Sequence, residues 1–183
     1  MDLTGVDLTA ETVRTERLLL RPPTSADVDP VTRACQDPDN QRWLTMLPSP
    51  YTREDAVEFL TGTVPRNRAA GTDLSWAVEA DGELVGMSGL HELTRGRLGP
   101  EIGYWTAPWA RRRGYAAEAA AGVARWALDR GAPRVHLYTD VANAASQAVA
   151  RGAGFTEEGV VRSCLAYRDG SRADAVLFGR LPR

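Results

Sequence analysis

The sequence predicts a single α+β domain over residues 1–183, with one mixed central sheet of about seven strands and about four helices. Its length of 183 residues is enough for one compact domain with its own core and too short for two. The order of the predicted elements points to the same class, since strands and a hairpin come first, then alternating strands and helices, then another hairpin. We expect residues 1–13 to form a flexible N-terminal segment.

The first part of the chain predicts one strand and two helices around an irregular segment. Residues 17–21 contain three consecutive leucines, which is typical of a short buried strand, and the prolines that follow end it. Thr24 is a suitable N-cap for the first helix. Residues 37–50 contain prolines at positions 38, 48 and 50 and predict irregular structure. The capping-box pattern that starts at Thr52 predicts a second helix over residues 53–64.

The middle of the chain predicts three strands. Residues 74–79 and 83–92 are apolar and favour strands. They are joined by Asp81-Gly82, which is a strong signal for a hairpin. A turn rich in glycine and arginine then leads to a third strand over residues 100–106.

The rest of the chain alternates helix and strand before a final hairpin. Residues 116–130 carry apolar side chains at helical spacing, and Gly131 ends this helix. A strand over residues 135–139 follows, and Asn143 caps a short helix that ends near residues 152–154. The last two strands are residues 155–161 and 173–181, with a turn at Asp169-Gly170.

The composition is that of an ordinary globular protein, with 43% hydrophobic and 25% charged residues. A net charge of -2 argues against a nucleic-acid partner, which would require a basic excess. Cys35 and Cys164 have no second sulfur or histidine at ligand spacing, so we predict two reduced thiols and no metal. The chain shows neither a membrane-spanning run nor a signal peptide, which favours a cytoplasmic protein without a membrane partner. All 22 Lys+Arg residues are arginine, which suggests a GC-rich, bacterial genome.

Three consecutive arginines, Arg111, Arg112 and Arg113, precede Gly114 where a predicted strand passes into a predicted helix. A helix N-terminus carries partial positive charge, so cations gathered there are unfavourable unless an anion binds them. The glycine has no Cβ and lets an anion approach the free N–H groups. A solvated run of charges is the alternative, but the placement of this run favours a pyrophosphate-binding loop.

Five motifs, in order, resemble the GCN5-related N-acetyltransferase (GNAT) superfamily over nearly the whole chain. They are the opening strand at residues 15–22, the strand Glu101-Ile102-Gly103-Tyr104-Trp105, Arg111-x-x-Gly114-x-Ala116, Asn143-x-x-Ser146 and Gly154-Phe155. The nearest branch resembles the bacterial Rim-type enzymes, which acetylate α-amino groups of ribosomal proteins. The resemblance implies a GNAT-like sheet that is splayed at the cofactor site.

The resemblance also implies a binding site for acetyl-CoA, the acyl donor. The loop from Arg111 to Ala116 is expected to hold the pyrophosphate, mostly through main-chain N–H groups. The main chain of the adjoining strand is expected to pair with the pantetheine arm, and Asn143 to hydrogen-bond that arm. Ser146 is expected near the thioester sulfur, where it could donate a proton to the departing thiolate. The implied cofactor-binding residues are Tyr104, Trp105, Thr106, Arg111, Arg112, Arg113, Gly114, Tyr115, Ala116, Asn143 and Ser146.

Ser146 and Glu101 are the catalytic candidates. A serine in a first helical turn is ordinary, and Asn143 can be a plain N-cap as well as a ligand. Glu101 could act as a base through water or could pair with an arginine. His91 could lie across from Glu101 at the substrate, although a lone histidine is more often structural. Trp43 lies where the acceptor loop of the family is expected, so we predict that it contacts the substrate.

Two departures from the family pattern bear on the acceptor. Many GNAT enzymes have a tyrosine as general acid where this chain has Ala150, and some Rim-type members have a glutamate where it has Leu165. A site with a poor base favours an α-amine, because its pKa near ~8 lies below the ~10.4 of a lysine side chain, a difference of about 3 kcal/mol. We therefore expect direct transfer of acetyl to a primary amine, namely a protein or peptide α-amine.

Other acceptors and states stay open at this point. A small-molecule amine, such as an antibiotic, a polyamine or an amino-acid derivative, is the main alternative. A non-catalytic acyl-CoA-binding module is another, and the chain could be a monomer or a homodimer. An aminoglycoside would need an acidic groove, which could come from Asp37, Asp39, Glu54, Asp55 and Glu58.

Overall fold

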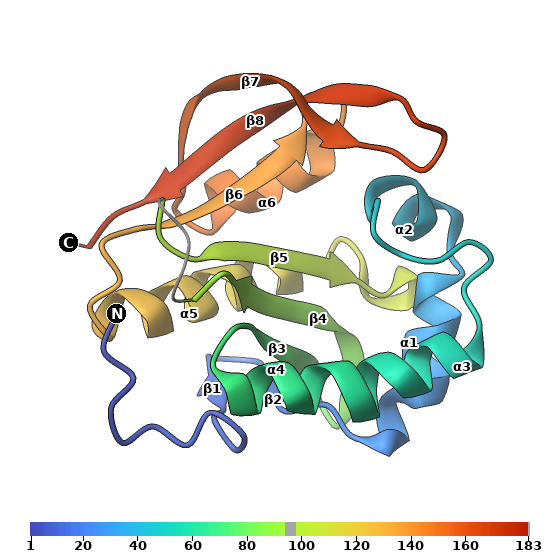
Figure 1. The fold of residues 1–183 in the computed structure, drawn as a ribbon, viewed down its shortest axis with the longest axis vertical. Helices are drawn as coiled ribbons and strands as arrows, with labels where there is room; N and C mark the ends of the chain where they lie inside the picture. Colours follow the sequence, from blue (N-terminus) through green and yellow to red (C-terminus); the bar gives the residue numbers. More distant parts are fainter. Residues whose placement is uncertain (94–97, 183) are drawn as a thin grey trace.

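One eight-stranded sheet forms the centre of the protein, in the order β1-β2-β3-β4-β5-β6-β8-β7 (Figure 1). The computed structural model describes residues 1–93 and 98–182. Neighbouring strands are antiparallel except for β5 and β6, which are parallel. The predicted α+β class and the mixed sheet are thereby confirmed. The strands are β1 (Val13–Arg14), β2 (Leu19–Arg21), β3 (Leu74–Ala80), β4 (Glu83–His91), β5 (Glu101–Thr106), β6 (Val135–Asp140), β7 (Thr156–Ala166) and β8 (Arg172–Arg180).

The strand that the sequence did not predict is β1. It consists of two residues, of which Val13 is buried and pairs with Leu20 of β2, while Arg14 is exposed. A pattern of alternating burial needs about four residues to be visible in a sequence, so this strand left no signal.

The first predicted hairpin has the expected turn geometry. Asp81 and Gly82 both have left-handed backbone, with φ of 52° and 81°. A two-residue type I′ turn requires φ above zero at both positions, which Asp-Gly adopts readily. The predicted turn rich in glycine and arginine falls on residues 94–97 and lies outside the described residues.

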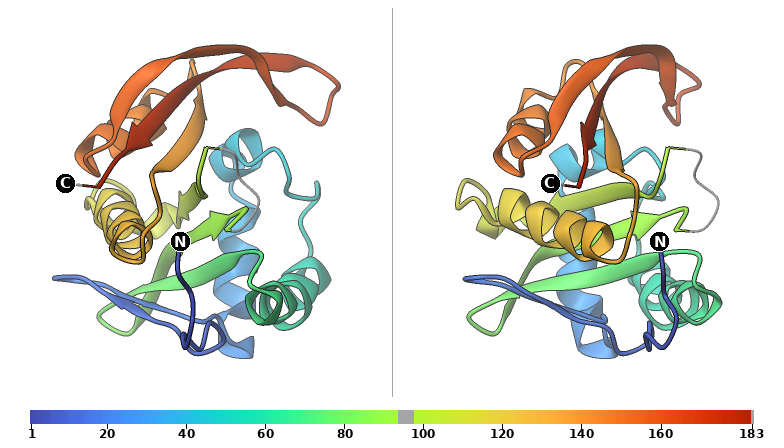
Figure 2. Two further views of the ribbon diagram at one scale, coloured as in Figure 1. Left: turned by 60° about the vertical axis from the view of Figure 1, so that its left-hand side comes forward. Right: turned by 90° about the vertical axis from the view of Figure 1, so that its left-hand side faces the viewer.

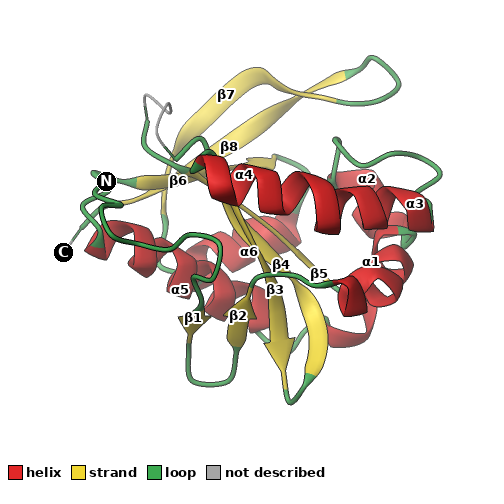
Figure 3. Cartoon of the chain, turned by 60° about the horizontal axis from the view of Figure 1, so that its bottom comes forward, coloured by secondary structure: helices red, strands yellow, loops and turns green. Residues whose placement is uncertain are grey.

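Helices cover both faces of the sheet, as Figures 2 and 3 show. On one face α5 packs on β1, β4 and β5, and α6 packs beside it on β6 and β7. On the other face α1 packs on β4 and α4 packs on β3. Within the described residues, no helix is long and apolar enough to cross a membrane. The helices are α1 (Val28–Cys35), α2 (Pro38–Trp43), α3 (Arg53–Val57), α4 (Val64–Ala70), α5 (Tyr115–Asp129) and α6 (Ala144–Gly152).

The segment over residues 37–50, which was expected to be irregular, contains α2. Asp37 caps this helix, because its carboxylate accepts the N–H of Asn40 at 3.2 Å. Pro38 occupies the first turn, where an N–H would have no partner within the helix, so a proline is tolerated there. The expectation was wrong because this proline starts a helix.

The helix predicted over residues 53–64 is longer than expected. It continues from α3 through a wide π-helical segment, Glu58–Thr63, into α4. In this segment the N–H of Val64 donates to the carbonyl of Phe59, one residue farther back than in an α-helix. The wide turn precedes Pro65, which has no N–H to donate, so the helix passes the proline.

The sheet opens between β5 and β6. The two strands pair at Glu101 and His136, where the N–H of His136 also donates to the Pro100 carbonyl at 3.1 Å. Beyond this point β5 stays paired with β4, and β6 stays paired with β8. The facing edge of residues 102–106 therefore has no strand partner within the described residues, and Figure 1 shows the two strands diverging. This confirms the splayed sheet.

The side chains of β5 alternate between the two faces of the sheet. Ile102 belongs to the buried cluster that includes α5, whereas Trp105 also packs against the cluster formed by α1 and α3. By the period of two along a strand, Tyr104 points to the α5–α6 face and Glu101 points to the α1–α4 face.

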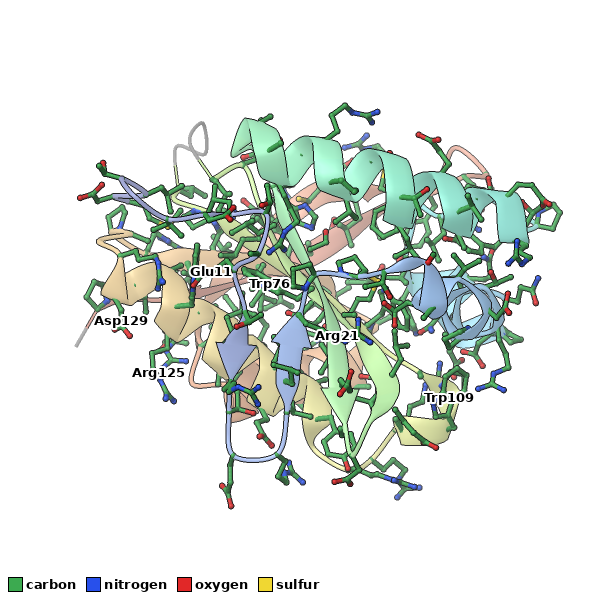
Figure 4. All side chains as sticks on the ribbon, turned by 90° about the horizontal axis from the view of Figure 1, so that it is seen from below. Glu11, Arg21, Trp76, Trp109, Arg125 and Asp129 are labelled. Atoms are coloured by element: carbon green, nitrogen blue, oxygen red, sulfur yellow. The ribbon has the colours of Figure 1, made fainter. Side chains whose placement is uncertain are left out.

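Glu11 joins the N-terminal segment to the core, and Figure 4 shows it beside Trp76. Its backbone carbonyl accepts the indole N–H of Trp76 at 2.8 Å. Its carboxylate accepts the indole N–H of Trp126 at 2.7 Å and pairs with Arg130 at 2.8 Å. The flexibility expected of residues 1–13 stays a prediction.

Replacing Glu11 by Ala is expected to lower the free energy of unfolding by about 1–3 kcal/mol. The change leaves the Trp126 indole N–H and the Arg130 guanidinium without their shared acceptor. Urea unfolding followed by tryptophan fluorescence measures the effect. Glu16→Ala, at an exposed carboxylate in the β1–β2 turn, is the control and should stay within about 0.5 kcal/mol of the original chain. Equal stabilities of the two variants would contradict the anchoring role of Glu11.

Candidate active site

A cavity of about 770 Å³ lies in the opening between β5 and β6. Its walls come from both strands, from α2, from the loop that precedes α5, and from α6. It reaches from Arg112 and Gly114 at the start of α5 to Glu101 and Leu165. The cavity thus exists because the two strands part.

The loop before α5 has a backbone suited to an anion. Arg112 and Gly114 both have left-handed backbone, with φ of 65° and 80°. Turns of this kind bring successive N–H groups together into an anion-binding concavity. Gly114 is the N-cap of α5, a helix of 15 residues whose first N–H groups have no partner within the helix. The geometry fits the predicted pyrophosphate loop.

The Arg111 side chain holds this loop against α2. Its guanidinium pairs with Asp37 and Asp39 and donates to the Asn40 side chain. Partial burial raises the pKa of Asp37, but the hydrogen bond from Arg111 outweighs it and the net pKa lies below its ordinary value. Within residues 1–93 and 98–182, the other two arginines of the run have no carboxylate partner. Of these two, Arg112 lines the cavity and is available to a ligand there.

Two further contacts fix the loop. The Trp109 indole N–H donates to the Leu84 carbonyl at 3.1 Å. On the other side Arg17 donates to the Arg113 carbonyl at 3.1 Å and pairs with Glu118 in the first turn of α5. Because the loop is ordered before a ligand arrives, little conformational entropy is lost on binding.

Ser146 lies in the first turn of α6, across the cavity from β5. Its N–H donates to Asn143 Oδ1 at 3.0 Å, so Asn143 caps the helix as predicted, and its amide NH₂ can still donate to a ligand. The Tyr104 hydroxyl lies 3.1 Å from both the carbonyl oxygen and the Oγ of Ser146. Burial raises the pKa of Tyr104 to about 12, and the hydrogen bond to Ser146 opposes the rise only in part.

Three carboxylates line the cavity, and two of them are engaged. Asp39 pairs with Arg111 at 3.1 Å. Asp140 accepts the Ala142 N–H at 2.7 Å and the Tyr167 hydroxyl at 2.5 Å. Glu101, the third, accepts no hydrogen bond from the part of the chain that the structure describes.

Glu101 stands between two histidines. His91 is its register partner on β4, and the His136 Nε2 lies 3.9 Å from its carboxylate on the β6 side. Burial raises the pKa of Glu101 above its ordinary value of 4.5, while the charge of His91 opposes the rise and that of Glu92 adds to it. A raised pKa makes the ionised carboxylate a stronger base.

A second cavity, of about 510 Å³, adjoins the first between α2 and the β7–β8 turn. Figure 1 shows α2 below the tip of this hairpin. The Tyr167–Asp140 hydrogen bond ties the turn to the end of β6, and Arg168 ties it to α2 through the Leu44 carbonyl at 3.0 Å. Residues common to the two cavities are Trp43, Thr45 and Asp140.

The first cavity brings together most residues that the sequence predicted. Every predicted cofactor-binding residue except Arg113 lines it, as do Glu101 and Trp43. Arg113 is exposed and contributes its carbonyl to the anchoring contact with Arg17. His91 lies across from Glu101 as expected, but its ring turns to Asp73, with 3.2 Å between Nδ1 and Oδ1. It is absent from the cavity walls, so a substrate contact by His91 is not supported.

The five acidic residues that could have formed a groove for an aminoglycoside do not come together in the described structure. Of the five acidic residues that were candidates, Asp39 alone lines either cavity, and it pairs with Arg111. Asp55 instead accepts the N–H and the hydroxyl of Thr52 at the start of α3. Within the described residues, no group of three or more His, Cys, Asp and Glu side chains could hold a metal ion.

The sequence reasoning missed the Tyr104 hydroxyl, Asp140 and Tyr167. Tyr104 was expected to serve through its main chain, and no spacing rule links it to a serine 42 residues away. Asp140 had a local signal, because it directly follows the strand predicted over residues 135–139 and precedes the Asn143 cap. Tyr167 had none, since its place opposite Asp140 depends on how the last hairpin folds back.

Comparisons with known proteins identify the family. Residues 17–156 match the family described as the acetyltransferase (GNAT) domain. The uncharacterized N-acetyltransferase YoaA of Bacillus subtilis (strain 168) is 27% identical over 169 residues, covering 91% of this chain and 94% of that protein. The chain therefore belongs to the GNAT acetyltransferase family and is an N-acetyltransferase, as its motifs predicted.

Solved structures share the fold and include members of the Rim-type branch. RimJ of Mycobacterium smegmatis, in complex with CoA-disulfide, has a TM-score of 0.82 and 25% identity, with 94% of this chain and 88% of that chain covered. RimL, the ribosomal L7/L12 α-N-protein acetyltransferase in complex with coenzyme A, has a TM-score of 0.79 and 20% identity, with 94% and 98% covered. MccE, the microcin C7 self-immunity acetyltransferase in complex with acetyl-CoA and AMP, has a TM-score of 0.80 and 17% identity, with 91% and 93% covered.

Replacing Gly114 by Val is expected to weaken the binding of CoA about tenfold or more, or ~1.4 kcal/mol. A branched side chain at φ of 80° strains the loop and intrudes where the anion approaches. Isothermal titration calorimetry with CoA measures the effect.

The matched control for this substitution is Gly131→Val. Gly131 has the same φ of 80° just after α5, far along the chain from the loop, and an added Cβ would meet nothing within 4 Å. Both variants should lose similar folding stability, and the Gly131 variant should keep the original CoA affinity. Unchanged CoA affinity in the Gly114 variant would mean that the anion site lies elsewhere.

Proposed function

We propose that the chain transfers the acetyl group of acetyl-CoA directly to a primary amine, and that this amine is the α-amine of a protein or peptide. The observation that carries the proposal is the junction of the two cavities at Trp43 and Asp140. An acyl donor in the first cavity and an acceptor entering through the second would meet in the opening between β5 and β6. Direct transfer needs both substrates held together, which two adjoining cavities allow.

The first cavity fits acetyl-CoA. Arg112 and the main-chain N–H groups of residues 114–116 would hold the pyrophosphate. The unpaired edge of β5, residues 102–106, offers N–H and C=O groups to an extended pantetheine arm, and the Asn143 NH₂ would donate to it. When bound, acetyl-CoA supplies an activated acetyl group whose leaving group is a thiolate.

Glu101 is the residue that we assign as the base for the acceptor amine. Of the three carboxylates in the first cavity, it is the one that is engaged neither by an arginine nor by a hydroxyl of the described residues. Burial raises its pKa, so its ionised form is a stronger base than an ordinary carboxylate. Glu101 lines the same cavity as Trp43 of α2, from whose side the acceptor would come.

Leu165 supports a weakly basic acceptor. It lines the first cavity at the position where some Rim-type enzymes have a glutamate, so an apolar wall replaces a second base there. With Glu101 acting alone, an amine that is easily deprotonated is favoured, which fits an α-amine better than a lysine side chain.

The names of the structural neighbours support two classes of acceptor. RimL is an α-N-protein acetyltransferase of ribosomal L7/L12, which favours a protein α-amine. MccE is an immunity enzyme bound to AMP, which favours the alternative of a small-molecule amine. Since YoaA and RimJ come from bacteria, we extend the proposal to a bacterial, cytoplasmic enzyme.

Release of free thiol from acetyl-CoA, measured over a panel of acceptors, tests the proposed function. We expect release with peptides that have a free N-terminus, and little release with the same peptides blocked at the N-terminus but carrying a lysine. Release confined to polyamines, aminoglycosides or free amino acids would assign the enzyme to small-molecule amines. CoA binding without release from any acceptor would favour a non-catalytic binding module.

The pH dependence of kcat/KM tests the role of Glu101. In the original enzyme the rate should rise with pH through the raised pKa of Glu101, above 4.5, because the carboxylate must lose its proton before it can accept another. The Glu101→Gln variant should lack this rise at acidic pH (the acid limb of the profile), and its kcat/KM should be about 100- to 10,000-fold lower. A second limb near ~8, from the α-amine of the acceptor, should persist in both enzymes.

The matched variant for this measurement is His91→Gln. The charge of His91 lowers the pKa of Glu101, so its removal should move the acid limb to higher pH without abolishing it. An acid limb that is the same in Glu101→Gln as in the original enzyme would exclude Glu101 as the base.

A further inference from the structure

The hydroxyl groups of Tyr104 and Ser146 form a pair inside the first cavity. The Tyr104 oxygen lies 3.1 Å from Ser146 Oγ and 3.1 Å from the Ser146 carbonyl oxygen. Both residues line the cavity, Tyr104 from β5 and Ser146 from α6. The pair therefore bridges the opening between the strand and the helix.

Both members of the pair are held in place by other contacts. Tyr104 is paired with Ser88 in the β4–β5 ladder, so its backbone cannot shift without breaking the sheet. The Ser146 N–H is fixed by the Asn143 cap at 3.0 Å. The distance between the two hydroxyls is therefore set by the fold rather than by a flexible side chain.

A count of protons shows what the pair can offer to a ligand. Tyr104 has one hydroxyl proton, and it can donate either to the Ser146 carbonyl or to Ser146 Oγ. If it donates to the carbonyl, the Tyr104 oxygen is left as an acceptor that competes with a ligand for the Ser146 proton. If it donates to Oγ, the Ser146 proton is free for a third group in the cavity. An anion in the cavity favours the second arrangement, since Tyr104 then no longer competes with it for the Ser146 proton.

We propose that Tyr104 is a positioning residue that holds Ser146 Oγ so that the serine hydroxyl donates a hydrogen bond to the departing thiolate. This inference rests on the proposed function, because it concerns the sulfur of the acyl donor. It also accounts for Ala150, the position at which many GNAT enzymes have a tyrosine. Ala150 is fully buried, and in this chain a tyrosine hydroxyl reaches the serine from β5 instead.

The balance of the step favours hydrogen bonding over proton transfer. As the amine nitrogen bonds to the acetyl carbon, the carbon–sulfur bond breaks and its electron pair stays on sulfur. Glu101 takes the proton that the nitrogen loses and later returns it to water. A thiol has a pKa near ~8.5, and Tyr104 has a pKa of about 12, so both hydroxyl protons stay on oxygen. The thiolate is stabilised in place and is protonated by water after release.

The pH dependence of binding by CoA and by desulfo-CoA tests this inference without turnover. The two ligands differ by the sulfur atom alone, so the ratio of their affinities reports on what the protein does for that atom. If Ser146 stabilises the thiolate, binding lowers the pKa of the CoA thiol. The affinity of CoA relative to desulfo-CoA should then increase between pH 6 and pH 10, by about tenfold for each unit by which the thiol pKa is lowered. The difference in ultraviolet absorbance between the CoA and desulfo-CoA samples at each pH follows the thiolate, because the protein and the nucleotide contribute equally to both.

Three variants assign the effect to the pair. Ser146→Ala should lose the gain completely, and Ser146→Thr, which keeps a hydroxyl, should retain part of it. Tyr104→Phe should reduce the gain at least threefold, because it removes the oxygen that holds Ser146 Oγ. Tyr138→Phe is the matched control, since Tyr138 lines the same cavity without a hydrogen bond to Ser146 in the described structure, and it should keep the full gain.

The outcomes separate this inference from the proposed function. Failure of both ligands to bind would overturn the proposed function itself and this inference with it. Equal affinities of CoA and desulfo-CoA at every pH would leave the acetyl-CoA site intact and overturn the thiolate site. A full gain in Tyr104→Phe together with its loss in Ser146→Ala would leave Ser146 as the donor and overturn the role of Tyr104.

Discussion

The end of the ladder between β5 and β6 is the constraint on which the site depends. Within the described chain, Glu101 and His136 are the residues that pair across this boundary, after which each strand stays with its outer neighbour. Backbone N–H and C=O groups on an open edge need a partner, and leaving them buried without one costs about as much as a lost hydrogen bond. An opening of this kind is stable when water or a ligand fills it. The same parting exposes Glu101 at its vertex and lets α6 bring Ser146 up to β5.

The short helix α2 couples the two halves of the site. Its acidic N-terminus binds Arg111, which fixes the loop proposed to hold the pyrophosphate. Its last residue, Trp43, is a wall of both cavities. A six-residue helix is not stable on its own, so its position depends on the Asp37 cap and on these ion pairs. A shift of α2 would therefore change both the loop before α5 and the second cavity. Arg111, which the sequence assigned to an anion, thus has a structural role, because it holds the loop before α5 against α2.

Most of the fold could be predicted from the sequence because its signals are local. The Asp-Gly turn at residues 81–82, the apolar spacing along α5 and the Asn143 cap each act within a few residues of the feature that they specify. The loop proposed to hold the pyrophosphate has a local signal too, since Arg112, Gly114 and the first turn of α5 are close together in the sequence. The failures have a physical cause in each case. Pro38 starts α2, whereas the prolines of residues 37–50 predict irregular structure. The strand β1 has two residues, which are too few to show an alternation of buried and exposed side chains. The contacts of Tyr104 with Ser146, and of Tyr167 with Asp140, join elements that meet only in the folded chain.

The alternation of side chains along β5 separates the two chemical tasks of the site. Glu101 and Tyr104 are three residues apart, which places them roughly 10 Å apart along the strand and on opposite faces of the sheet. The carboxylate proposed as the base thus faces the α1–α4 side of the sheet, and the Tyr104 hydroxyl faces α6, where the sulfur of the donor would lie. A base and a hydrogen-bond donor that were adjacent would neutralise one another by bonding directly. Their separation across the parted sheet keeps both free. An acetyl group held in the opening between the strands would lie between them, so the proposed site depends on the parting of β5 and β6.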